Sequence, residues 1–523
     1  MDFFQSQKFA FRVEKLMSQH HVPGLAIAVV QNGQISSAAY GKASLEPPIE
    51  CSTSTLFDIA SSSKSLTAAS VALLVDDNEN YPEVHYDAIM SSLLPGDFQM
   101  QDAVYTQGIT VEDILSHRTG MAAHDCSYMG IRAAEPDNAR SITRNLQNLP
   151  VAAPLRSRYL YCNMMYTVAT HLVEVKTKEK FSDFLEKHFF EPLDMHSTHL
   201  QPSRARERGF GDRIALGHHW TGASSGYREF QTPDCPEGQG AGSVMSSVDD
   251  FIKWVKALMD QEGPINERVY HGLVRTRSFP NPNGRRLKPF TSPAMYAAGM
   301  EVYYYRGYMV VGHDGDIAGF GSRFFFMPDL NFGVVILGNS SSTAPVASTL
   351  ARELMDAALE IPEEERQKRA RVKKVQKPAK SRSQMKPSGT QVSVGPEAHV
   401  KPFAKGEVNE DGRSGSSDTI PQRQERPLTQ YAGKFRHPGY RDLTVQIKED
   451  RLFVDASDRS LGFTLIFEHV QDQSKYSARL IDCLDGGEDL IDAEFVFEGD
   501  VAMRMGLKLE DSLKNLIWFD RQS

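Results

Sequence analysis

The sequence lacks the features that mark export, membrane insertion or metal binding. Residues 1–8 contain no basic stretch followed by an apolar run, and no run of about 18 apolar residues occurs along the chain. The five cysteines are scattered, odd in number, and form no Cys-x-x-Cys pair. Such usage is typical of a reducing compartment and argues against a metal site. We therefore expect a cytoplasmic protein that binds no membrane, no metal and no cofactor.

An excess of basic charge is also lacking. The formal net charge is −9, which argues against a nucleic-acid-binding surface spread over the whole chain. Hydrophobic residues make up 40% of the sequence, which is enough for large cores. At about 150 residues per domain the length suggests several structural units, although single domains of 250 residues or more are common.

Three regions of different composition follow one another. Residues 1–360 carry helix and strand patterns: an amphipathic helix over 7–20 precedes two apolar runs that flank Asn32-Gly33, a dipeptide typical of hairpin turns. Residues 361–424 are poor in apolar side chains and hold ten Lys and Arg between Arg366 and Lys386. This composition predicts a disordered linker, with a nuclear-import or RNA-binding tract as the alternative for its basic part.

Order is expected to resume in residues 425–523, where short strands alternate with turns. The predicted strands are Tyr431–Phe435, His437–Tyr440, Leu443–Ile447, Arg451–Val454, Phe463–Phe467, Ala493–Phe497 and Leu516–Phe519. Within the first region, residues 201–237 are loop-rich and aromatic. They are a candidate pocket wall, with simple core filling as the alternative reading.

The stretch around Ser61 carries the clearest chemistry. Ser61 stands where a short apolar run ends and an Ala- and Leu-rich helix pattern begins, so it suits a helix cap. Lys64 follows three residues later, on the same helix face. A serine needs a base to become a nucleophile, and a lysine is a base only when a dry setting lowers its pKa from about 10.4 toward 7. The apolar residues after Lys64 make that setting plausible.

Ser61-x-x-Lys64 resembles a signature of serine β-lactamases and penicillin-binding proteins. Further along, Tyr161-x-Asn163 is similar to that family's Tyr-x-Asn element, and His313-x-Gly315 to the His-x-Gly variant of its class C and esterase branch. Each match is short, but the three occur in the family's order. The resemblance implies an α+β fold: an antiparallel sheet flanked by helices, a helical subdomain, and a separate C-terminal small β-barrel similar to lipocalins.

The resemblance also implies roles for single residues. Ser61 is the expected nucleophile, and Lys64 and Tyr161 are expected to move its proton, Tyr161 as base or acid with Lys64 stabilising its phenolate. Asn163 is expected to contact the substrate or Lys64, and the N–H groups of Ser61 and Asp316, next to Gly315 on an edge strand, to form the oxyanion hole. His313 is expected to steady Tyr161 or polarise the substrate. His117 is expected to be structural.

The function expected from this pattern is hydrolysis of an ester or amide bond in a small metabolite through an acyl-enzyme on Ser61. Three alternatives stay open: an acyltransferase or transesterase of secondary metabolism, a D-aminopeptidase-like peptidase, and a non-catalytic scaffold that kept the fold. The expected partner is a small-molecule ester, amide or acyl substrate. The C-terminal barrel is expected either to cover the active site or to join copies of the chain into a homo-oligomer.

Overall fold

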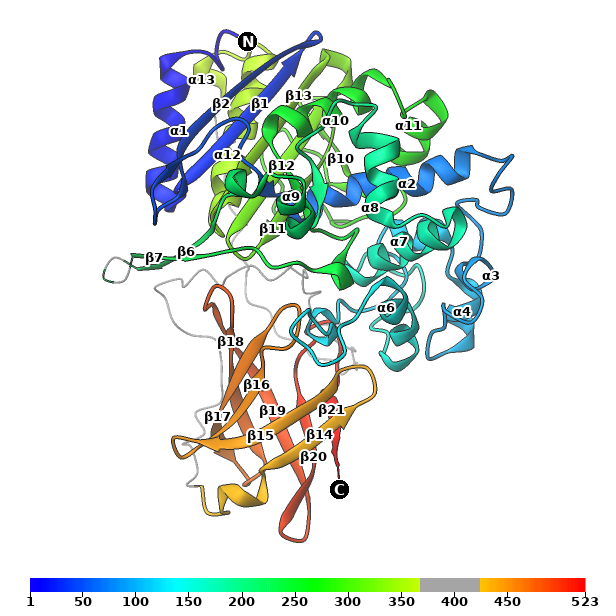
Figure 1. The fold of residues 1–523 in the computed structure, drawn as a ribbon, viewed down its shortest axis with the longest axis vertical. Helices are drawn as coiled ribbons and strands as arrows, with labels where there is room; N and C mark the ends of the chain where they lie inside the picture. The colour runs from blue at the N-terminus through cyan, green and yellow to red at the C-terminus, as the bar shows by residue number, and fades with distance from the viewer. Residues whose placement is uncertain (223, 225, 367–423, 523) are drawn as a thin grey trace, which may run out of the picture.

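The computed structural model describes residues 1–222, 224, 226–366 and 424–522. A large N-terminal part carries a central sheet with helices on both faces, and a β-barrel lies against one end of it (Figure 1). The predicted α+β architecture with an appended barrel is therefore confirmed. Within these described ranges, no helix combines the length and apolar character needed to cross a bilayer.

The central sheet has eight strands in the order β3-β2-β1-β13-β12-β11-β10-β9, and every neighbouring pair is antiparallel. The bounds are β1 (Gly24–Gln31), β2 (Gln34–Ser44), β3 (Ile49–Glu50), β9 (Met295–Tyr296), β10 (Glu301–Tyr305), β11 (Tyr308–Ile317), β12 (Phe320–Met327) and β13 (Phe332–Gly338). Asn32 and Gly33 form the predicted turn between β1 and β2, both with positive φ.

Both faces of the sheet are buried, which explains the continuous apolar run of β1. Alternate residues of a strand point to opposite faces. Leu25, Ile27 and Val29 pack with helices α1 (Gln7–His20) and α12 (Thr343–Ala358) in one core. Ala26, Ala28 and Val30 belong to the second core, which contains α2 (Lys64–Asp76) and α10 (Val248–Asp260).

A helical subdomain extends from the second face. It includes α3 (Met90–Leu93), α4 (Ala103–Gly108), α5 (Val111–Leu115), α6 (Ala139–Asn145), α7 (Met164–Thr177), α8 (Phe181–Leu185), α9 (Pro202–Glu207) and α11 (Glu267–Val274). A three-stranded sheet of β4 (Phe57–Asp58), β8 (Val244–Ser246) and β5 (His199–Leu200) lies beside it. Thr110 and Asp113 form the capping box at the start of α5.

The aromatic segment 201–237 does not line the cavity around Ser61, contrary to one of the two readings of the sequence. After α9, the segment forms a two-stranded hairpin of β6 (Gly217–Gly222) and β7 (Gly226–Phe230). Trp220 stacks on His21 with ring centroids 4.0 Å apart. Trp220 therefore serves packing, whereas Phe210 lines a separate, smaller cavity of 260 Å³.

The C-terminal barrel is closed by eight antiparallel strands. Its strands are β14 (Gly433–His437), β15 (Arg441–Lys448), β16 (Arg451–Ala456), β17 (Phe463–Gln471), β18 (Lys475–Asp482), β19 (Glu488–Glu498), β20 (Val501–Leu507) and β21 (Ile517–Arg521). The sequence prediction missed β18 and β20, and the strand predicted at His437–Tyr440 is instead the end of β14 followed by a turn. The inward positions of β18 and β20 include Ala478 and Ala502, small residues that give a weak strand signal although both are fully buried.

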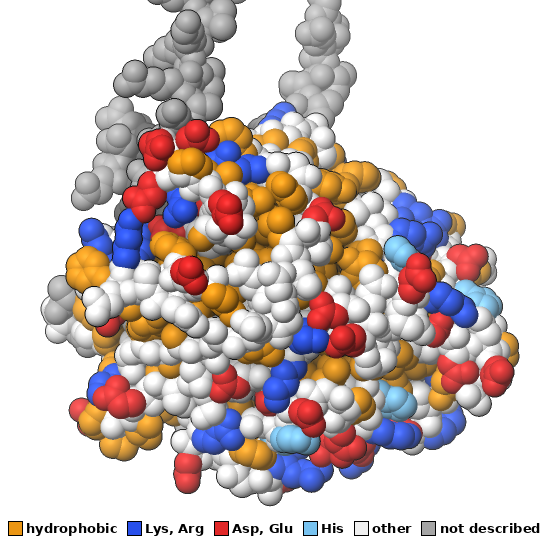
Figure 2. All heavy atoms as spheres, turned by 90° about the horizontal axis from the view of Figure 1, so that it is seen from above, with side chains coloured by type: hydrophobic (Ala, Val, Ile, Leu, Met, Phe, Trp, Pro, Cys, Tyr) orange, Lys and Arg blue, Asp and Glu red, His pale blue; other side chains and the backbone are white. Residues whose placement is uncertain are grey.

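The predicted linker lies almost wholly outside the described residues. At its start, Glu363–Arg366 form a helical turn, α13, and Glu363 pairs with Lys8 of α1. Arg12 pairs with Glu353 of α12 at 2.8 Å. Figure 2 shows the end of the N-terminal part that is turned away from the barrel, with basic and acidic side chains interspersed across it.

Candidate active site

Ser61 lies in a tight 3-10 turn, Ala60–Ser63, that runs directly into α2. Ala60 takes the left-handed conformation with φ of 46°, which residues other than glycine rarely adopt. The carboxylate of Asp58 accepts a hydrogen bond of 2.8 Å from the Ala60 N–H and holds this turn. Ser61 therefore lies directly before the first turn of a buried helix.

The structure brings Ser61, Lys64 and Tyr161 together. Lys64 Nζ lies 2.9 Å from Ser61 Oγ, and the Tyr161 hydroxyl donates to the same oxygen at 2.8 Å. Tyr161 comes from the segment before α7, 100 residues away in sequence. The serine oxygen thus lies between an amine and a phenol, both of which can exchange protons.

Lys64 is fully buried, and burial lowers its pKa to about 7. Asp125 opposes that shift through its negative charge. Nζ contacts two fixed acceptors besides Ser61: Oδ1 of Asn163 at 2.8 Å and the carbonyl oxygen of Ala241 at 2.7 Å. Asn163 therefore contacts the lysine, one of the two positions expected from the sequence.

Tyr161 is held as a neutral phenol. Burial raises its pKa well above 10, against the smaller effect of its hydrogen bond with Ser61. Lys64 Nζ lies 4.8 Å from the ring centroid of Tyr161, so the cation contacts the ring. The expected phenolate is therefore disfavoured, because burial penalises its negative charge.

Asp125 is a site residue that the sequence did not reveal. Its two carboxylate oxygens each lie 3.3 Å from Nδ2 of Asn163, which fixes the amide so that Oδ1 faces Lys64. Burial raises the pKa of Asp125 to about 6. No motif surrounds this residue, so sequence spacing gives no signal for it.

Two histidines of the motifs, His117 and His313, both contact Tyr296. His117 Nδ1 accepts from the Cys162 N–H, so its Nε2 carries the proton and donates to Tyr296 Oη at 3.2 Å. His313 Nδ1 donates to the Asp314 carbonyl, so its Nε2 accepts from Tyr296 Oη at 2.9 Å. Burial lowers the pKa of both histidines, that of His313 to about 4.

This chain of contacts changes the role expected for His313. Both ring nitrogens are bonded within the protein, to Asp314 and Tyr296, so neither points a proton at a substrate. The hydrogen-bond partner of His313 is Tyr296 rather than Tyr161, whose ring centroid is 6.5 Å away. His117 is structural in the sense expected, since it supports the backbone next to Tyr161.

Gly315 brings strand β11 against the nucleophile turn. A Cβ at this position would lie 2.4 Å from the carbonyl oxygen of Ile59 and 2.3 Å from Ser322 Oγ, so only glycine fits. The expectation of an edge strand requires correction, because β11 pairs with β12 on one side and with β10 on the other. Pairing with β10 reaches only Gly312, however, and Asp316 lines the cavity that contains Ser61.

That cavity has a volume of 640 Å³. Its walls come from the segment before α7, from β10 and β11, and from residues 277–285. Apolar and aromatic groups include Tyr159, Leu160 and Phe279, and the last is 56% exposed. The described residues offer no cluster of three or more His, Cys, Asp or Glu side chains arranged to hold a metal ion.

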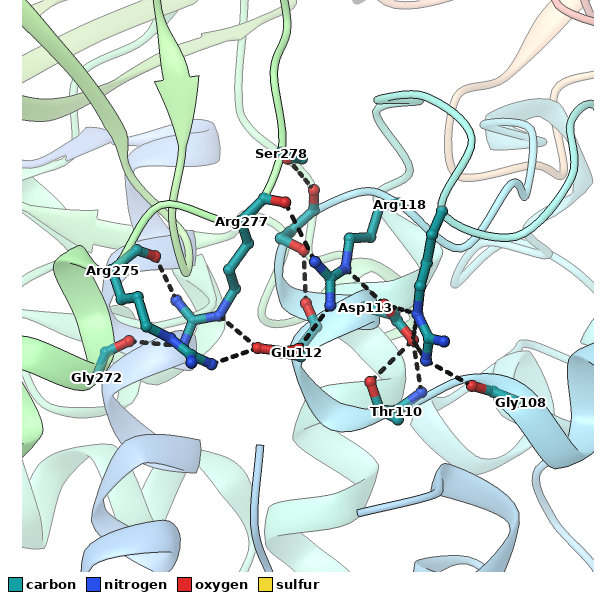
Figure 3. A network of polar contacts seen from close by, with 11 residues as sticks. Gly108, Thr110, Glu112, Asp113, Arg118, Gly272, Arg275, Arg277 and Ser278 are labelled. Atoms are coloured by element: carbon teal, nitrogen blue, oxygen red, sulfur yellow. Dashed lines mark hydrogen bonds and ion pairs between the residues drawn. The ribbon is translucent and has the colours of Figure 1, made fainter. Parts of the chain in front are cut away.

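Arginines line one side of the cavity, and three of them pair with the carboxylates of Glu112 and Asp113. Figure 3 shows this network of polar contacts. Arg118 bonds to both Glu112 and Asp113 at 2.6 Å. Arg156 bonds to Asp113 at 2.7 Å, and Arg277 lies 3.3 Å from Glu112. These contacts tie the wall to the start of α5, so we read the three guanidinium groups as structural.

Comparisons with known proteins identify the families that the two parts of the chain match. The family model described as Beta-lactamase matches residues 9–359, and the model described as Domain of unknown function (DUF3471) matches residues 418–521. An unguisins hydrolase of Aspergillus campestris is 31% identical over 99% of this chain and 92% of that protein.

Solved structures show the same fold. The octameric penicillin-binding protein homologue from Pyrococcus abyssi superposes with a TM-score of 0.57 over 98% of both chains, at 17% identity. The D-amino acid amidase from Ochrobactrum anthropi gives 0.53 over 67% of this chain and 99% of its own, at 20% identity. With a family match over residues 9–359, this chain belongs to the beta-lactamase family.

Proposed function

We propose that this protein hydrolyses an ester or amide bond of a small metabolite through an acyl-enzyme on Ser61. The position of Ser61 Oγ carries the proposal: it lies between Lys64 Nζ, at 2.9 Å, and the Tyr161 hydroxyl, at 2.8 Å. The residue also lines a cavity of 640 Å³. A serine that only capped a helix would need neither a buried lysine nor access to a cavity.

Lys64 is the base in this proposal. A neutral amine has two N–H bonds and one lone pair. Asn163 Oδ1 and the Ala241 carbonyl accept the two N–H bonds, which leaves the lone pair for Ser61. A pKa of about 7 keeps a large fraction of Lys64 neutral near pH 7. Ser61 then passes its proton to Nζ as Oγ bonds to the substrate carbonyl carbon.

Tyr161 is the proton donor. Its raised pKa keeps the phenol protonated, and its hydroxyl already points at the reacting oxygen. When the bond between the acyl carbon and the leaving oxygen or nitrogen breaks, the leaving atom takes a proton from Tyr161. The Lys64 ammonium then returns a proton to the Tyr161 oxygen. Water then attacks the acyl-enzyme by the reverse of these steps and releases the acid.

The N–H groups of Ser61 and Asp316 are the proposed oxyanion donors. Support comes from the tight contact at Gly315, which sets β11 directly against the Ile59–Ala60 backbone that precedes Ser61. Donors fixed in this way are worth roughly 2.7–4 kcal/mol each in other serine hydrolases.

The substrate class follows from the cavity and from a relative. The relative from Aspergillus campestris is an unguisins hydrolase, so unguisins are the first natural compounds to test. Tyr159 and Phe279 offer aromatic surface to an apolar substrate next to Ser61. Release of the acyl group to water makes the protein a hydrolase; transfer to an added alcohol or amine would make it an acyltransferase.

Labelling with a fluorophosphonate followed by mass spectrometry tests this proposal. We expect one adduct, located on Ser61, and loss of both labelling and turnover in Ser61→Ala. Ser157→Ala is the matched control, because Ser157 lines the same cavity and only bonds back to the Pro154 carbonyl. Folded wild-type protein that forms no Ser61 adduct would favour the non-catalytic scaffold.

A further inference from the structure

The barrel contacts the N-terminal part behind Lys64, on the loop that carries Asp125. Gly130 N donates to the Asp458 carbonyl at 2.9 Å, and Ser460 N donates to the Tyr128 carbonyl at 3.1 Å. The two backbones approach so closely that a Cβ on Gly130 would lie 2.9 Å from Ser460 N. On the barrel side, a Cβ on Gly439 would lie 2.5 Å from a methyl group of Leu149. These close contacts fix the position of the barrel against the N-terminal part.

His124, the residue before Asp125, is anchored from both sides. It takes the left-handed conformation with φ of 51° and is fully buried. Its Nε2 bonds to the Pro150 carbonyl at 2.8 Å, and its Nδ1 bonds to the hydroxyl of Tyr440, a barrel residue, at 2.7 Å. A strained backbone persists only where its surroundings hold it, and here the barrel supplies one of the two anchors.

Glu510, in the connection between β20 and β21, adds to the same contact. Its carboxyl group lies 3.9 Å from His124 Nδ1 and receives the backbone N–H groups of Ala123 and His124. Burial and the charge of Asp125 raise the pKa of Glu510 to about 8. The loop before Asp125 is thus held by an uncharged acid from the barrel at neutral pH.

A second route reaches the other acceptor of Lys64. Ser460 of the barrel donates to the buried carboxylate of Glu237 and lies 3.0 Å from Cys235 Sγ. Glu237 belongs to the turn Pro236–Gly238, and the Gly238 carbonyl accepts from the Ala241 N–H. The carbonyl of Ala241 is the group that binds Lys64 Nζ.

We propose that the C-terminal barrel positions the acceptors of Lys64, with Tyr440 acting through His124, Asp125 and Asn163, and Ser460 acting through Glu237 and Ala241. The inference rests on the proposed role of Lys64 as base. None of these barrel residues touches the reacting atoms, so they are positioning residues. Because both acceptors decide which way the lysine lone pair points, a small shift of either one removes the base from Ser61.

Tyr440→Phe tests the first route, with Tyr431→Phe as its matched control. Both tyrosines are buried in the barrel and lose one hydroxyl; that of Tyr431 bonds to the Gln473 carbonyl at the β17–β18 turn. We expect Tyr440→Phe to lower kcat roughly tenfold with KM within about twofold, because misplacement of the base slows the chemistry more than binding. Tyr431→Phe should keep the wild-type kcat. Ser460→Ala tests the second route and should lower kcat in the same way.

Hydrogen exchange provides a readout that does not depend on turnover. In Tyr440→Phe the amides of residues 123–130 and 160–166 should exchange faster than in wild type and in Tyr431→Phe. Equal kcat and equal exchange in the two tyrosine variants would overturn the inference, as would a loss confined to KM. A wild-type protein that fails to label at Ser61 would instead contradict the proposed function, while the exchange comparison would still decide whether the barrel holds the Asp125 loop.

Discussion

Lys64 Nζ and Ser61 Oγ are 2.9 Å apart, one turn from each other at the start of a buried helix. The amine is enclosed, with its two other contacts made to neutral oxygens of Asn163 and Ala241. Neither acceptor carries a charge that would hold the ammonium form strongly. This relationship makes Lys64 the group on which the chemistry of the site depends.

Replacing Lys64 should remove the base. We expect Lys64→Met to keep the fold and to lower kcat/KM about 10³-fold, since general-base catalysis contributes roughly 10²–10⁴-fold. Lys176→Met is the control, because Lys176 pairs with Glu83 at the surface of α7 and should retain full activity. Steady-state kinetics on an activated ester measures both, and a Lys64→Met variant with wild-type turnover would assign the base elsewhere.

Asp125 should set the pH at which the base becomes active. Its negative charge raises the pKa of Lys64, so Asp125→Asn should lower that pKa further and move the acidic limb of the kcat/KM profile to lower pH. The new amide oxygen can still accept from Asn163. Kinetics between pH 5 and 9 measure the shift. A limb that stays in place, or that moves to higher pH, would mean that Asp125 does not act on Lys64.

Tyr161→Phe should separate substrates by their leaving groups. An amide nitrogen needs a proton to leave, whereas a p-nitrophenolate leaves without one. We expect a loss of about 10²-fold on an amide and a much smaller loss on a p-nitrophenyl ester of the same acyl group. For each substrate, the kcat/KM of wild type is divided by that of Tyr161→Phe, and the two losses are compared. Equal losses on both substrates would show that Tyr161 does not protonate the leaving group.

Gly315→Ala should damage both stability and activity. The added Cβ would lie 2.4 Å from the Ile59 carbonyl, so β11 or the nucleophile turn must move. We expect the free energy of unfolding to fall by about 1–3 kcal/mol, as for other overpacked sites, and acylation of Ser61 to slow. Gly211→Ala is the control, since the nearest atom to its Cβ would be at 3.4 Å. Chemical denaturation of the two variants compares them, and equal stabilities would contradict the close packing.

Much of the catalytic set could be predicted from the sequence, for physical reasons that differ between residues. Ser61 and Lys64 are one helical turn apart, so their proximity is a local property. Tyr161 lies far along the chain, and only its resemblance to a known element placed it in the site. The hairpin at Asn32-Gly33 and the capping box at Thr110 were predictable because turns and caps are set by a few adjacent residues.

The remaining contacts depend on how distant segments pack. Asp125 contacts Asn163 across 38 residues, and Tyr440 contacts His124 across 316. Neither stands in a local pattern. The role of His313 depends on Tyr296. The Tyr296 hydroxyl forms a hydrogen bond with His313 Nε2, the nitrogen expected to face Tyr161 or the substrate. Strands β18 and β20 of the barrel were missed although Tyr476, Leu480, Met505 and Leu507 are buried in them. The small residues Ala478 and Ala502 interrupt these apolar rows and weaken the strand pattern.

The pH dependence of Ser61 labelling by a fluorophosphonate tests the central claim most directly. Because the lysine must be neutral to accept the proton of Ser61, the second-order rate should rise about tenfold per pH unit below pH 7 and level off above it, in keeping with a pKa of about 7 for Lys64. The Lys64→Met variant should label slowly and without this limb. A rate that stays flat between pH 5 and 9 in the wild-type protein, with the adduct on Ser61, would contradict the assignment of Lys64 as the base.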